Sequence, residues 1–509
     1  MRSHFYDDYY YHFMILLLVF AATLLVLLWR RQRTGIWRLP PGPRRLPLIG
    51  NLHQLGNDLP HISLQKLSNE YGPLMFLKLG SLPTLVVSSA DLAEKILKTH
   101  DLVFSNRPMF YAPAKLSYGY SDISFSPYGE YWREVKKIAV LELLSAKKVL
   151  SYQAVREEEV ALAINLIRTS SSSSVPVNLS EILLCLINNV VCRVAFGLKY
   201  ETAQDEEDGK NKIYVTLQET QNLLVGFSTA DLFPWMSWIH KFDGLDKKLE
   251  KNFRHMDEFY DNVIDEHISK SSKAGVEEDF VDVLLRVQKD PSQGITLTRD
   301  NIKGILMDTF VAGTDTSAAT LVWTMTELIR NPTVMQRAQE EVRSLTGLKD
   351  MVDESDLHKL SYTKLVIKEA FRLHPPAPLL VPRETREKCT INGYDIPIKT
   401  SVLINAKAIS TDPEYWRNPY EFYPERFLNS NIDYKGQDFE LLPFGGGRRG
   451  CPGISFSVVL VELVLANLLL CFDWNLPSEM KIEDVDMSEA FGLTTHKKVP
   501  LCLLADNRK

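Results

Sequence analysis

The sequence has few cysteines and no excess of basic charge. Its 509 residues include six cysteines, and none of them forms a C-x-x-C pair. That spacing argues against a disulfide scaffold and a zinc motif, and it favours a reducing compartment. The chain has 58 basic and 64 acidic residues, a net charge of −6, and lacks the basic footprint of a nucleic-acid-binding protein. We therefore expect no nucleic-acid partner.

Long uncharged runs are also missing, with one exception at residues 9–29, YYYHFMILLLVFAATLLVLLW. The overall composition, 45% hydrophobic and 24% charged, is that of a globular protein. The run is long enough to cross a bilayer core of about 30 Å. Acidic residues precede it and arginines follow it, so the N-terminus is expected in the lumen and the body in the cytosol. This charge order, without a cleavage site after it, favours a retained anchor over a signal peptide.

Three regions are predicted along the chain. Residues 1–33 form the membrane anchor, with its transmembrane part at about 9–29, and residues 34–45 form a proline-rich hinge containing LPPGP. Residues 46–509 form one catalytic domain, mostly helical, with a hairpin of strands at 74–80 and 84–89. The apolar segment 223–239, interrupted by Pro234, is expected either in the core or at the bilayer surface.

A glycine-rich loop, PFGGGRRGCPG at 443–453, delivers Cys451 to the start of an apolar helix. Glycine lets the backbone turn tightly, and a helix N-terminus favours a thiolate, so we expect Cys451 to be an anion. Such a cysteine can be a nucleophile, a zinc ligand or a haem ligand, and the lack of a partner at metal-site spacing disfavours zinc. The helix predicted at 454–472 carries Glu462 at its middle, which indicates a buried core helix.

A second helix is predicted from Arg299 to Arg330, capped by Thr298 and ended by Pro332. Its apolar body is interrupted by AGTDT at 312–316. The Thr316 hydroxyl can bond to the carbonyl of Ala312, and we expect the helix to open locally there and admit water. The alternative is a simple kink with a buried threonine network.

These motifs together resemble the cytochrome P450 family. The loop has the family's haem-binding pattern, F-x-x-G-x-R-x-C-x-G. The resemblance implies haem b with Cys451 as thiolate ligand to the metal, Phe444 in the loop beside it and Arg449 on a propionate. It also implies that Asp315 and Thr316 organise proton delivery for oxygen activation. The implied fold is the P450 fold, mainly α with a minor β-sheet region, plus one N-terminal transmembrane helix.

The spacing E-x-x-R occurs at Glu369 and Arg372, but the chain contains it four more times, at Glu130, Glu327, Glu340 and Glu414. Alone, this spacing usually marks an exposed ion pair. At Glu369 the order of the following motifs, with Arg426 in PERF, resembles the family's buried Glu-Arg-Arg network. That resemblance implies a structural role in bracing the cysteine loop.

Further matches imply the haem contacts and the substrate pocket. By resemblance, Trp132, Lys136 and Arg383 contact the haem propionates, although the family usually has arginine where this chain has Lys136, and lysine cannot form the bidentate contact. Substrate-pocket residues implied in the same way are Ala312, Ala377, Leu380 and Phe491, with parts of 107–126 and the helix face near Asp308. These linings are mostly apolar and imply a hydrophobic small-molecule substrate.

The wording of the motifs, such as FVAGTDTSAAT and PFGGGRRGCPG, is similar to the plant microsomal A-type branch of the family. The resemblance implies a single-pass endoplasmic reticulum enzyme that inserts oxygen from O2 into a terpenoid, alkaloid, phenylpropanoid or similar metabolite. Because the chain has no flavin-binding unit, its electrons are expected from NADPH through the separate NADPH-cytochrome P450 reductase. The alternatives are a P450-fold enzyme that rearranges or dehydrates its substrate without O2, which the Asp315–Thr316 pair disfavours, and a non-catalytic haem-binding membrane protein.

Overall fold

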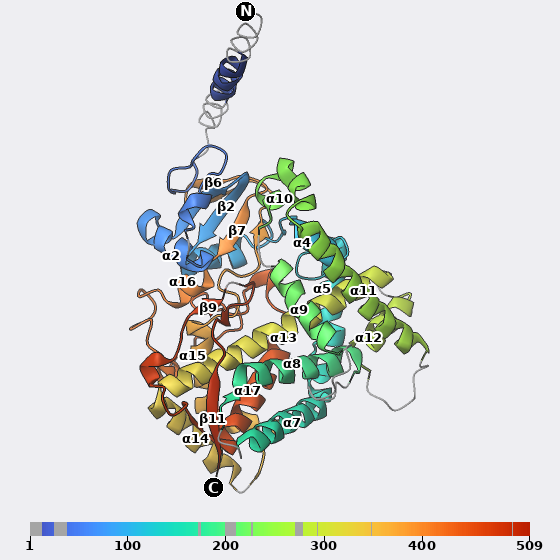
Figure 1. Cartoon of the computed structure of the whole chain (residues 1–509), viewed down its shortest axis with the longest axis vertical. Coiled ribbons are helices and arrows are strands. Elements are labelled where there is room, and N and C mark those ends of the chain that lie inside the picture. Colours follow the sequence, from blue (N-terminus) through green and yellow to red (C-terminus); the bar gives the residue numbers. More distant parts are fainter. Residues whose placement is uncertain are drawn as a thin grey trace, which may run out of the picture.

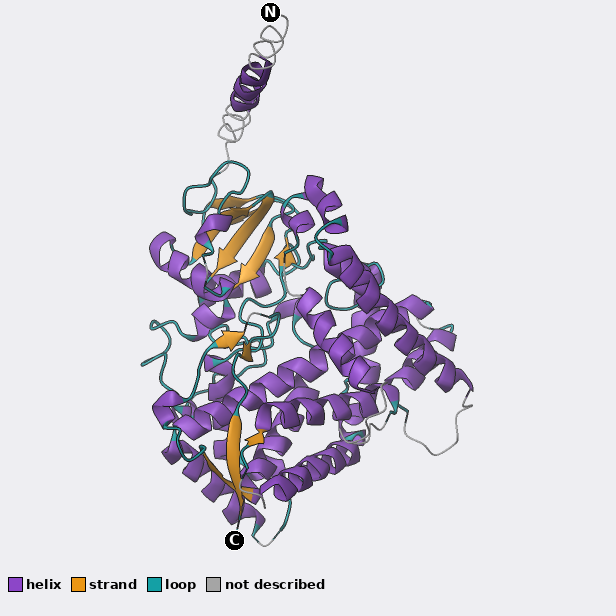
Figure 2. Ribbon diagram, in the orientation of Figure 1, coloured by secondary structure: helices purple, strands orange, loops and turns teal. Residues whose placement is uncertain are grey.

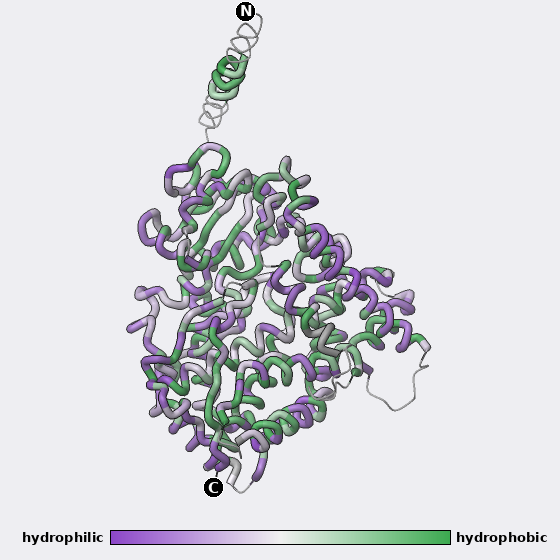
Figure 3. The backbone as a smooth tube through the Cα atoms, viewed as in Figure 1, coloured by the Kyte–Doolittle hydropathy of each residue, from purple (hydrophilic) through white to green (hydrophobic). Residues whose placement is uncertain are grey.

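A computed structural model describes most of the chain: residues 13–24, 38–56, 58–171, 175–198, 210–224, 227–269, 278–292, 294–347, 349–490 and 492–508. The first of these, Phe13–Leu24, is a short apolar helix whose side chains are mostly exposed. In Figure 3 it is one of the most hydrophobic parts of the backbone. The remainder of the predicted anchor, including its flanking charges, lies outside the described residues.

Helices make up most of the body (Figures 1 and 2). Their bounds are α2 (Pro60–Tyr71), α3 (Ala90–Glu94), α4 (Tyr111–Leu116), α5 (Glu130–Ile138), α6 (Ala146–Ser151), α7 (Gln153–Ser171), α8 (Leu179–Phe196), α9 (Lys210–Leu224), α10 (Thr229–Leu232), α11 (Leu245–Ser269), α12 (Phe280–Lys289), α13 (Arg299–Arg330), α14 (Pro332–Thr346), α15 (Ser361–Leu373), α16 (Ala406–Ser410) and α17 (Ile454–Cys471).

Strands form one four-stranded sheet and three smaller ones within the described ranges. The largest sheet has the order β1-β2-β7-β4 and contains the predicted hairpin. Its strands are β1 (Leu74–Leu79), β2 (Leu82–Val87), β7 (Ser401–Ile404) and β4 (Arg383–Glu384). The smaller sheets consist of β3 (Val177–Asn178), β11 (Cys502–Asn507) and β8 (Phe472–Asn475), of β5 (Cys389–Ile391) and β6 (Tyr394–Ile396), and of β9 (Glu489–Ala490) and β10 (His496–Lys497). The mainly helical class with a minor sheet region is therefore confirmed.

The long helix α13 runs through the centre of the body and begins and ends where the sequence predicts (Figure 1). Thr298 caps it in a reciprocal capping box with Asn301, which satisfies two backbone N–H groups at the helix start. Along its length α13 packs against α8 and α17. Both of these helices are apolar and long enough to span a membrane, yet more than half of each is buried inside the protein. For α17 this is the predicted core helix.

Within α13 the segment 312–316 is continuous helix. The prediction that the helix opens locally at this point is therefore wrong for this structure. The threonine-to-carbonyl bond that suggested the opening is present, but a hydroxyl in a helix can donate to the carbonyl four residues earlier without breaking the backbone ladder.

The apolar segment 223–239 divides between the two predicted alternatives, because Leu224 and Ala230 are buried in the core whereas the tryptophans that follow them are exposed. In the 3-10 helix η4 (Pro234–Lys241) Trp235 and Trp238 are 59% and 56% exposed, and Phe242 beyond it is 79% exposed. Burial in the core, one of the two predicted alternatives, is therefore wrong for these aromatic side chains. Exposed aromatic side chains that lie close together are typical of interaction surfaces.

Candidate active site

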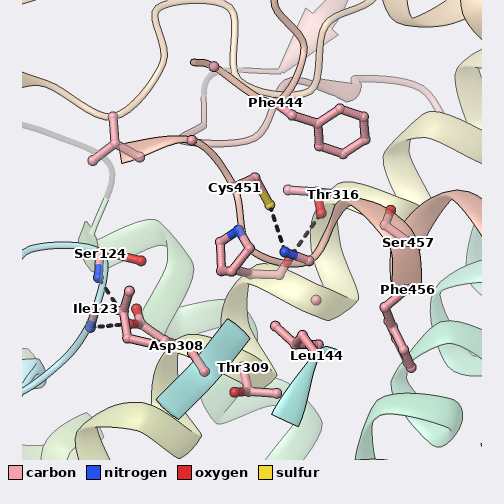
Figure 4. Close-up of a pocket in the computed structure, with 18 of the residues that line it drawn as sticks. Ile123, Ser124, Leu144, Asp308, Thr309, Thr316, Phe444, Cys451, Phe456 and Ser457 are labelled. Carbon is pink, nitrogen blue, oxygen red and sulfur yellow. Dashed lines mark hydrogen bonds between the residues drawn. The ribbon is translucent and has the colours of Figure 1, made fainter. Parts of the chain in front are cut away.

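One pocket brings together most of the predicted site residues (Figure 4). The loop 443–453 forms one wall, and α13 forms another with Ala312, Gly313 and Thr316. Other predicted residues that line it are Trp132, Lys136, Ala377, Leu380, Arg383, Phe444, Arg449 and Cys451. Of the predicted substrate contacts, Phe491 lies outside the described residues. The pocket thus joins the predicted cofactor residues to the predicted substrate residues.

The backbone conformation of Gly447 gives the cysteine loop its shape. Its φ of 62° lies in the left-handed region, where a side chain is strained. A Cβ at this position would also clash with the carbonyl oxygen of Leu97 and with Oδ1 of Asp101. The loop closes when the amide of Cys451 donates to the Phe444 carbonyl at 3.0 Å. These constraints hold the cysteine sulfur at a fixed place in the pocket.

The Cys451 sulfur is accessible from the pocket, but the protein surrounds the pocket on most sides. The amide of Gly453 donates to Sγ at 3.3 Å. Burial raises the pKa of the thiol, and the Gly453 amide and Lys136 offset only part of this effect. That Cys451 is an anion therefore stays a prediction, which the Gly453 amide and Lys136 favour and burial opposes. A metal ion bound to the sulfur would favour the thiolate strongly.

Four cationic side chains line the same pocket: Arg107, Lys136, Arg383 and Arg449. Burial and the neighbouring Arg383 lower the pKa of Arg449 to about 9, and burial lowers that of Lys136 to about 8. Lys136 donates to the Gly450 carbonyl at 2.7 Å, and Arg449 donates to the carbonyls of Ser105, Ile123 and Ser126. Among the described residues only Arg383 of the four pairs with a carboxylate, that of Asp101 at 3.1 Å.

This positive charge exceeds the negative charge that the described residues bring to the pocket lining. The one carboxylate among those lining residues, Asp308, is occupied by the amides of Ile123 and Ser124 at 2.5 and 3.0 Å (Figure 4). Buried cations are costly unless an anion pairs with them. Haem b carries two carboxylates on an apolar ring, and its iron accepts a cysteine ligand. The residues present therefore fit haem b, with Cys451 toward the iron and the arginines toward the propionates.

On α13 the two residues of the predicted oxygen-activation pair face different surroundings. Thr316 lines the pocket, and its hydroxyl donates to the Ala312 carbonyl at 2.7 Å, as predicted. Asp315 is not among the pocket residues, and its carboxylate pairs with His496 Nε2 at 2.8 Å. Consecutive helical residues differ in direction by about 100°, so both cannot face one pocket squarely.

The aromatic residue Trp132 supports the cation cluster. Its ring lies 4.1 Å from the guanidinium carbon of Arg449, and its Nε1 donates to the Ile123 carbonyl at 3.0 Å. Guanidinium groups stack favourably on aromatic faces. Trp132 therefore orients Arg449.

Glu369, Arg372 and Arg426 meet as the resemblance implies. The Arg372 guanidinium donates to both carboxylate oxygens of Glu369, at 2.7 and 2.8 Å, and Arg426 Nε donates to Oε1 at 3.0 Å. The side chains of Glu369 and Arg372 have no exposed surface. Beside this network on α15, the ring of Phe371 packs 5.1 Å from that of Phe444. The network is thus joined to the cysteine loop by direct packing.

Two functional features were not predicted from the sequence. Asp101 accepts hydrogen bonds from Arg383 and from the backbone and side chain of Arg448, and nothing local in the sequence marks it. The cationic character of the pocket at Arg107 was also missed, although its segment was expected there.

The glycine spacing of the cysteine loop does not indicate a nucleotide site. Gly445, Gly447 and Gly450 match the spacing G-x-G-x-x-G, but turns rather than a strand precede them, so they do not form a dinucleotide-binding unit.

Comparisons with known proteins agree with this geometry. The family model for cytochrome P450 matches residues 40–503. Cytochrome P450 71A9 of Glycine max is 61% identical and covers 92% of this chain and 93% of its own length. Strychnine-11-hydroxylase of Strychnos nux-vomica is 57% identical over 92% of this chain and 91% of its own length. A solved structure of a zebra fish cytochrome P450 with abiraterone has a TM-score of 0.72 and 25% identity, and covers 88% of this chain and 100% of that chain. The chain belongs to the cytochrome P450 family as a plant A-type member, an oxygen-incorporating oxidoreductase with a haem-thiolate cofactor.

Proposed function

We propose that the chain is a monooxygenase of the endoplasmic reticulum membrane that uses O2 and NADPH-derived electrons from a separate reductase to oxidise a hydrophobic plant metabolite. The observation that carries this proposal is a pocket in which Cys451, a cluster of buried cations and Thr316 meet. When bound there, thiolate-ligated haem activates O2 for insertion of one oxygen atom into a substrate.

The residues of the pocket have separate tasks in this proposal. Cys451 would ligate the iron, while Arg107, Arg383 and Arg449 would neutralise the propionates. Lys136 donates to the carbonyl of Gly450 and steadies the cysteine loop rather than reaching a propionate. Thr316 holds a hydroxyl at the pocket face of α13, where it orients water and passes protons, and Asp315 supplies protons from behind it.

The substrate class follows from the lining and from the relatives. Apolar side chains, such as those of Leu143, Val191 and Leu380, make up much of the remaining lining of the pocket. Such a site binds a hydrophobic molecule with few polar anchors. Similar proteins include strychnine-11-hydroxylase and phenylacetaldehyde oxime monooxygenase of Prunus mume, which is 48% identical. These support a plant specialised metabolite, such as an alkaloid, terpenoid or phenylpropanoid.

The membrane association rests on two apolar surfaces. Leu48 and Ile49 are exposed beside the β1–β2 turn, where the amide of Gly80 donates to the Ile49 carbonyl. The next amide, that of Ser81, donates to Leu232 of α10, the helix that leads into the exposed tryptophans of η4. Both apolar surfaces thus flank one turn at the end of the body where the chain enters from the hinge (Figure 1). We propose residues 1–33 as a single-pass anchor, 34–45 as the hinge and 46–509 as a cytosolic catalytic domain that rests on the bilayer.

Reconstitution with reductase in microsomes and a screen of plant metabolites tests the proposal. NADPH- and O2-dependent product with one added oxygen atom is the expected result. Product that needs neither NADPH nor O2 would indicate rearrangement or dehydration, and haem binding without any turnover would indicate a non-catalytic protein. Cys451→Ser is expected to abolish the thiolate-type spectrum of the reduced CO complex. Thr316→Ala is expected to keep that spectrum while diverting electrons to hydrogen peroxide.

A further inference from the structure

Asp315, on the side of α13 that does not line the active-site pocket, pairs with His496 near the protein surface. His496 Nε2 lies 2.8 Å from Asp315 Oδ2. The Asp315 side chain is 6% exposed, whereas that of His496 is 36% exposed. Among the described residues, His496 is the only ionisable side chain that pairs with Asp315. The pair therefore joins a buried carboxylate on α13 to a side chain that is partly open to solvent.

The position of His496 is fixed by the residues next to it. The amide of Thr495 donates to the Pro376 carbonyl at 2.8 Å, and the Thr495 carbonyl accepts from Trp323 Nε1 at 3.0 Å. Trp323 belongs to α13, and His496 itself pairs with Ala490 in the β9–β10 ladder. The imidazole is therefore held beside Asp315 by backbone contacts on either side of it.

His496 also lines a second cavity of about 300 Å³ that shares no lining residue with the active-site pocket in the described part of the chain. Ala318 and Ala319 of α13 form one side of this cavity, and Glu181 and Gln218 lie at its exposed rim. Lys497 also lines it, but its Nζ donates to the Val499 carbonyl at 2.7 Å. Asp315 and His496 thus separate a recess that is open to solvent on one side of α13 from the pocket that Thr316 lines on the other.

We propose that His496 is a positioning and proton-entry residue, which holds Asp315 and returns protons to it from the solvent in this second cavity. The inference rests on the proposed monooxygenase function. Each turnover would take one O2, two electrons and two protons, and would give the oxygenated product and one water. The imidazolium of His496 donates a proton to the paired Asp315 carboxylate, and Asp315 passes that proton toward Thr316 and its water, which restores the carboxylate. Water in the cavity then reprotonates the imidazole, so no proton is left unaccounted for.

Three variants test this role in the reconstituted holoenzyme. His496→Gln keeps a hydrogen-bond donor without an exchangeable charge, and His496→Arg keeps a cation that does not release its proton at neutral pH. The matched control is Lys497→Gln, because Lys497 is the next residue along β10 and lines the same cavity, but its ammonium group bonds to Val499. The reduced CO spectrum and substrate-binding spectrum report folding, and His496→Asn replaces the glutamine variant if that variant fails to fold.

The readouts are product formed per NADPH, hydrogen peroxide and the solvent deuterium isotope effect on product formation. A general acid–base residue contributes roughly 10²- to 10⁴-fold to the rate of a reaction. Because water can replace part of a proton relay, we expect a smaller effect for His496→Gln, about a three- to tenfold fall in product formed per NADPH. We expect a larger isotope effect, more peroxide, and no recovery in His496→Arg, while Lys497→Gln keeps wild-type coupling. Wild-type coupling in His496→Gln, or full recovery in His496→Arg, would overturn the inference. Absence of product from the wild-type enzyme would instead count against the proposed function.

Discussion

Two groups of buried arginines in this molecule differ in what balances their charge. In the first, Arg372 and Arg426 share the carboxylate of Glu369, so the chain supplies its own anion. In the second, Arg107 and Arg449 donate mainly to backbone carbonyl oxygens around the pocket, and burial lowers the pKa of both. Both arginines of the first group therefore have a carboxylate within ion-pair distance, whereas no described residue gives Arg107 or Arg449 one. A cation cluster that the chain leaves unbalanced marks the place where an anionic ligand belongs.

Removal of the shared carboxylate is expected to have the largest effect. Glu369→Gln leaves two buried guanidinium groups without their anion, at a cost of about 3 to 5 kcal/mol. We expect little or no protein with the reduced CO spectrum in membranes. Glu414→Gln has the same E-x-x-R spacing on an exposed side chain and serves as the matched control. Normal yield from Glu369→Gln would mean that the two arginine groups do not differ as described.

Loss of one unbalanced cation is expected to affect haem binding more than folding. For Arg449→Gln we expect haem retention to fall roughly tenfold or more, because a hydrogen bond to a charged group contributes about 1.5 to 3 kcal/mol. Haem transfer to an acceptor protein measures this loss. Arg448→Gln is the neighbouring control, since that side chain is 49% exposed and Asp101 still pairs with Arg383 without it. Equal haem loss from both variants would contradict the assignment.

A third set of cations is exposed and suits a protein partner. Of the basic residues near the cysteine loop, Lys137 and Arg448 are 57% and 49% exposed, while Lys136 and Arg449 are inside the pocket. We expect Lys137→Glu with Arg448→Glu to slow reduction by the reductase roughly three- to tenfold at low salt, with a smaller difference at high salt. Stopped-flow reduction measures the rate. The control is Lys66→Glu, because Lys66 is 65% exposed on α2. An equal slowing of reduction by this variant would contradict a specific role of Lys137 and Arg448 in binding the reductase.

The last expected effect concerns a buried glutamate that lacks the partners of Glu369. Burial raises the pKa of Glu462 to about 7, and Lys364 at 3.9 Å offsets this only in part. The folded state therefore binds the proton more tightly than the unfolded state does. The resulting stability is present below the ordinary pKa of 4.5 and is lost as the pH rises through about 7. The thermal unfolding midpoint of the wild type should therefore fall between pH 4.5 and 7, and Glu462→Gln should reduce this fall. The same dependence of the midpoint on pH in both proteins would contradict the prediction.

Local signals predicted the fold better than the site. The cap at Thr298 and the proline after Arg330 predicted the bounds of α13, because a helix start and end depend on neighbouring residues. The role of Asp101 could not be predicted, because its partner Arg383 lies 282 residues away in the sequence. The different directions of Asp315 and Thr316 were predictable from helical spacing alone, but the partner of Asp315 was not, since it arrives on β10.

The cation cluster also bears on how the protein is made. Its hydrogen bonds join residues far apart in the chain: Arg107 to Val381 across 274 positions, and Arg449 to Ser105 across 344. Contacts of such long range form slowly and late. During synthesis the predicted anchor emerges from the ribosome long before the cysteine loop has been added. A nascent chain therefore has no complete haem cradle until almost its whole length has emerged, and haem capture becomes one of the last steps of its biogenesis.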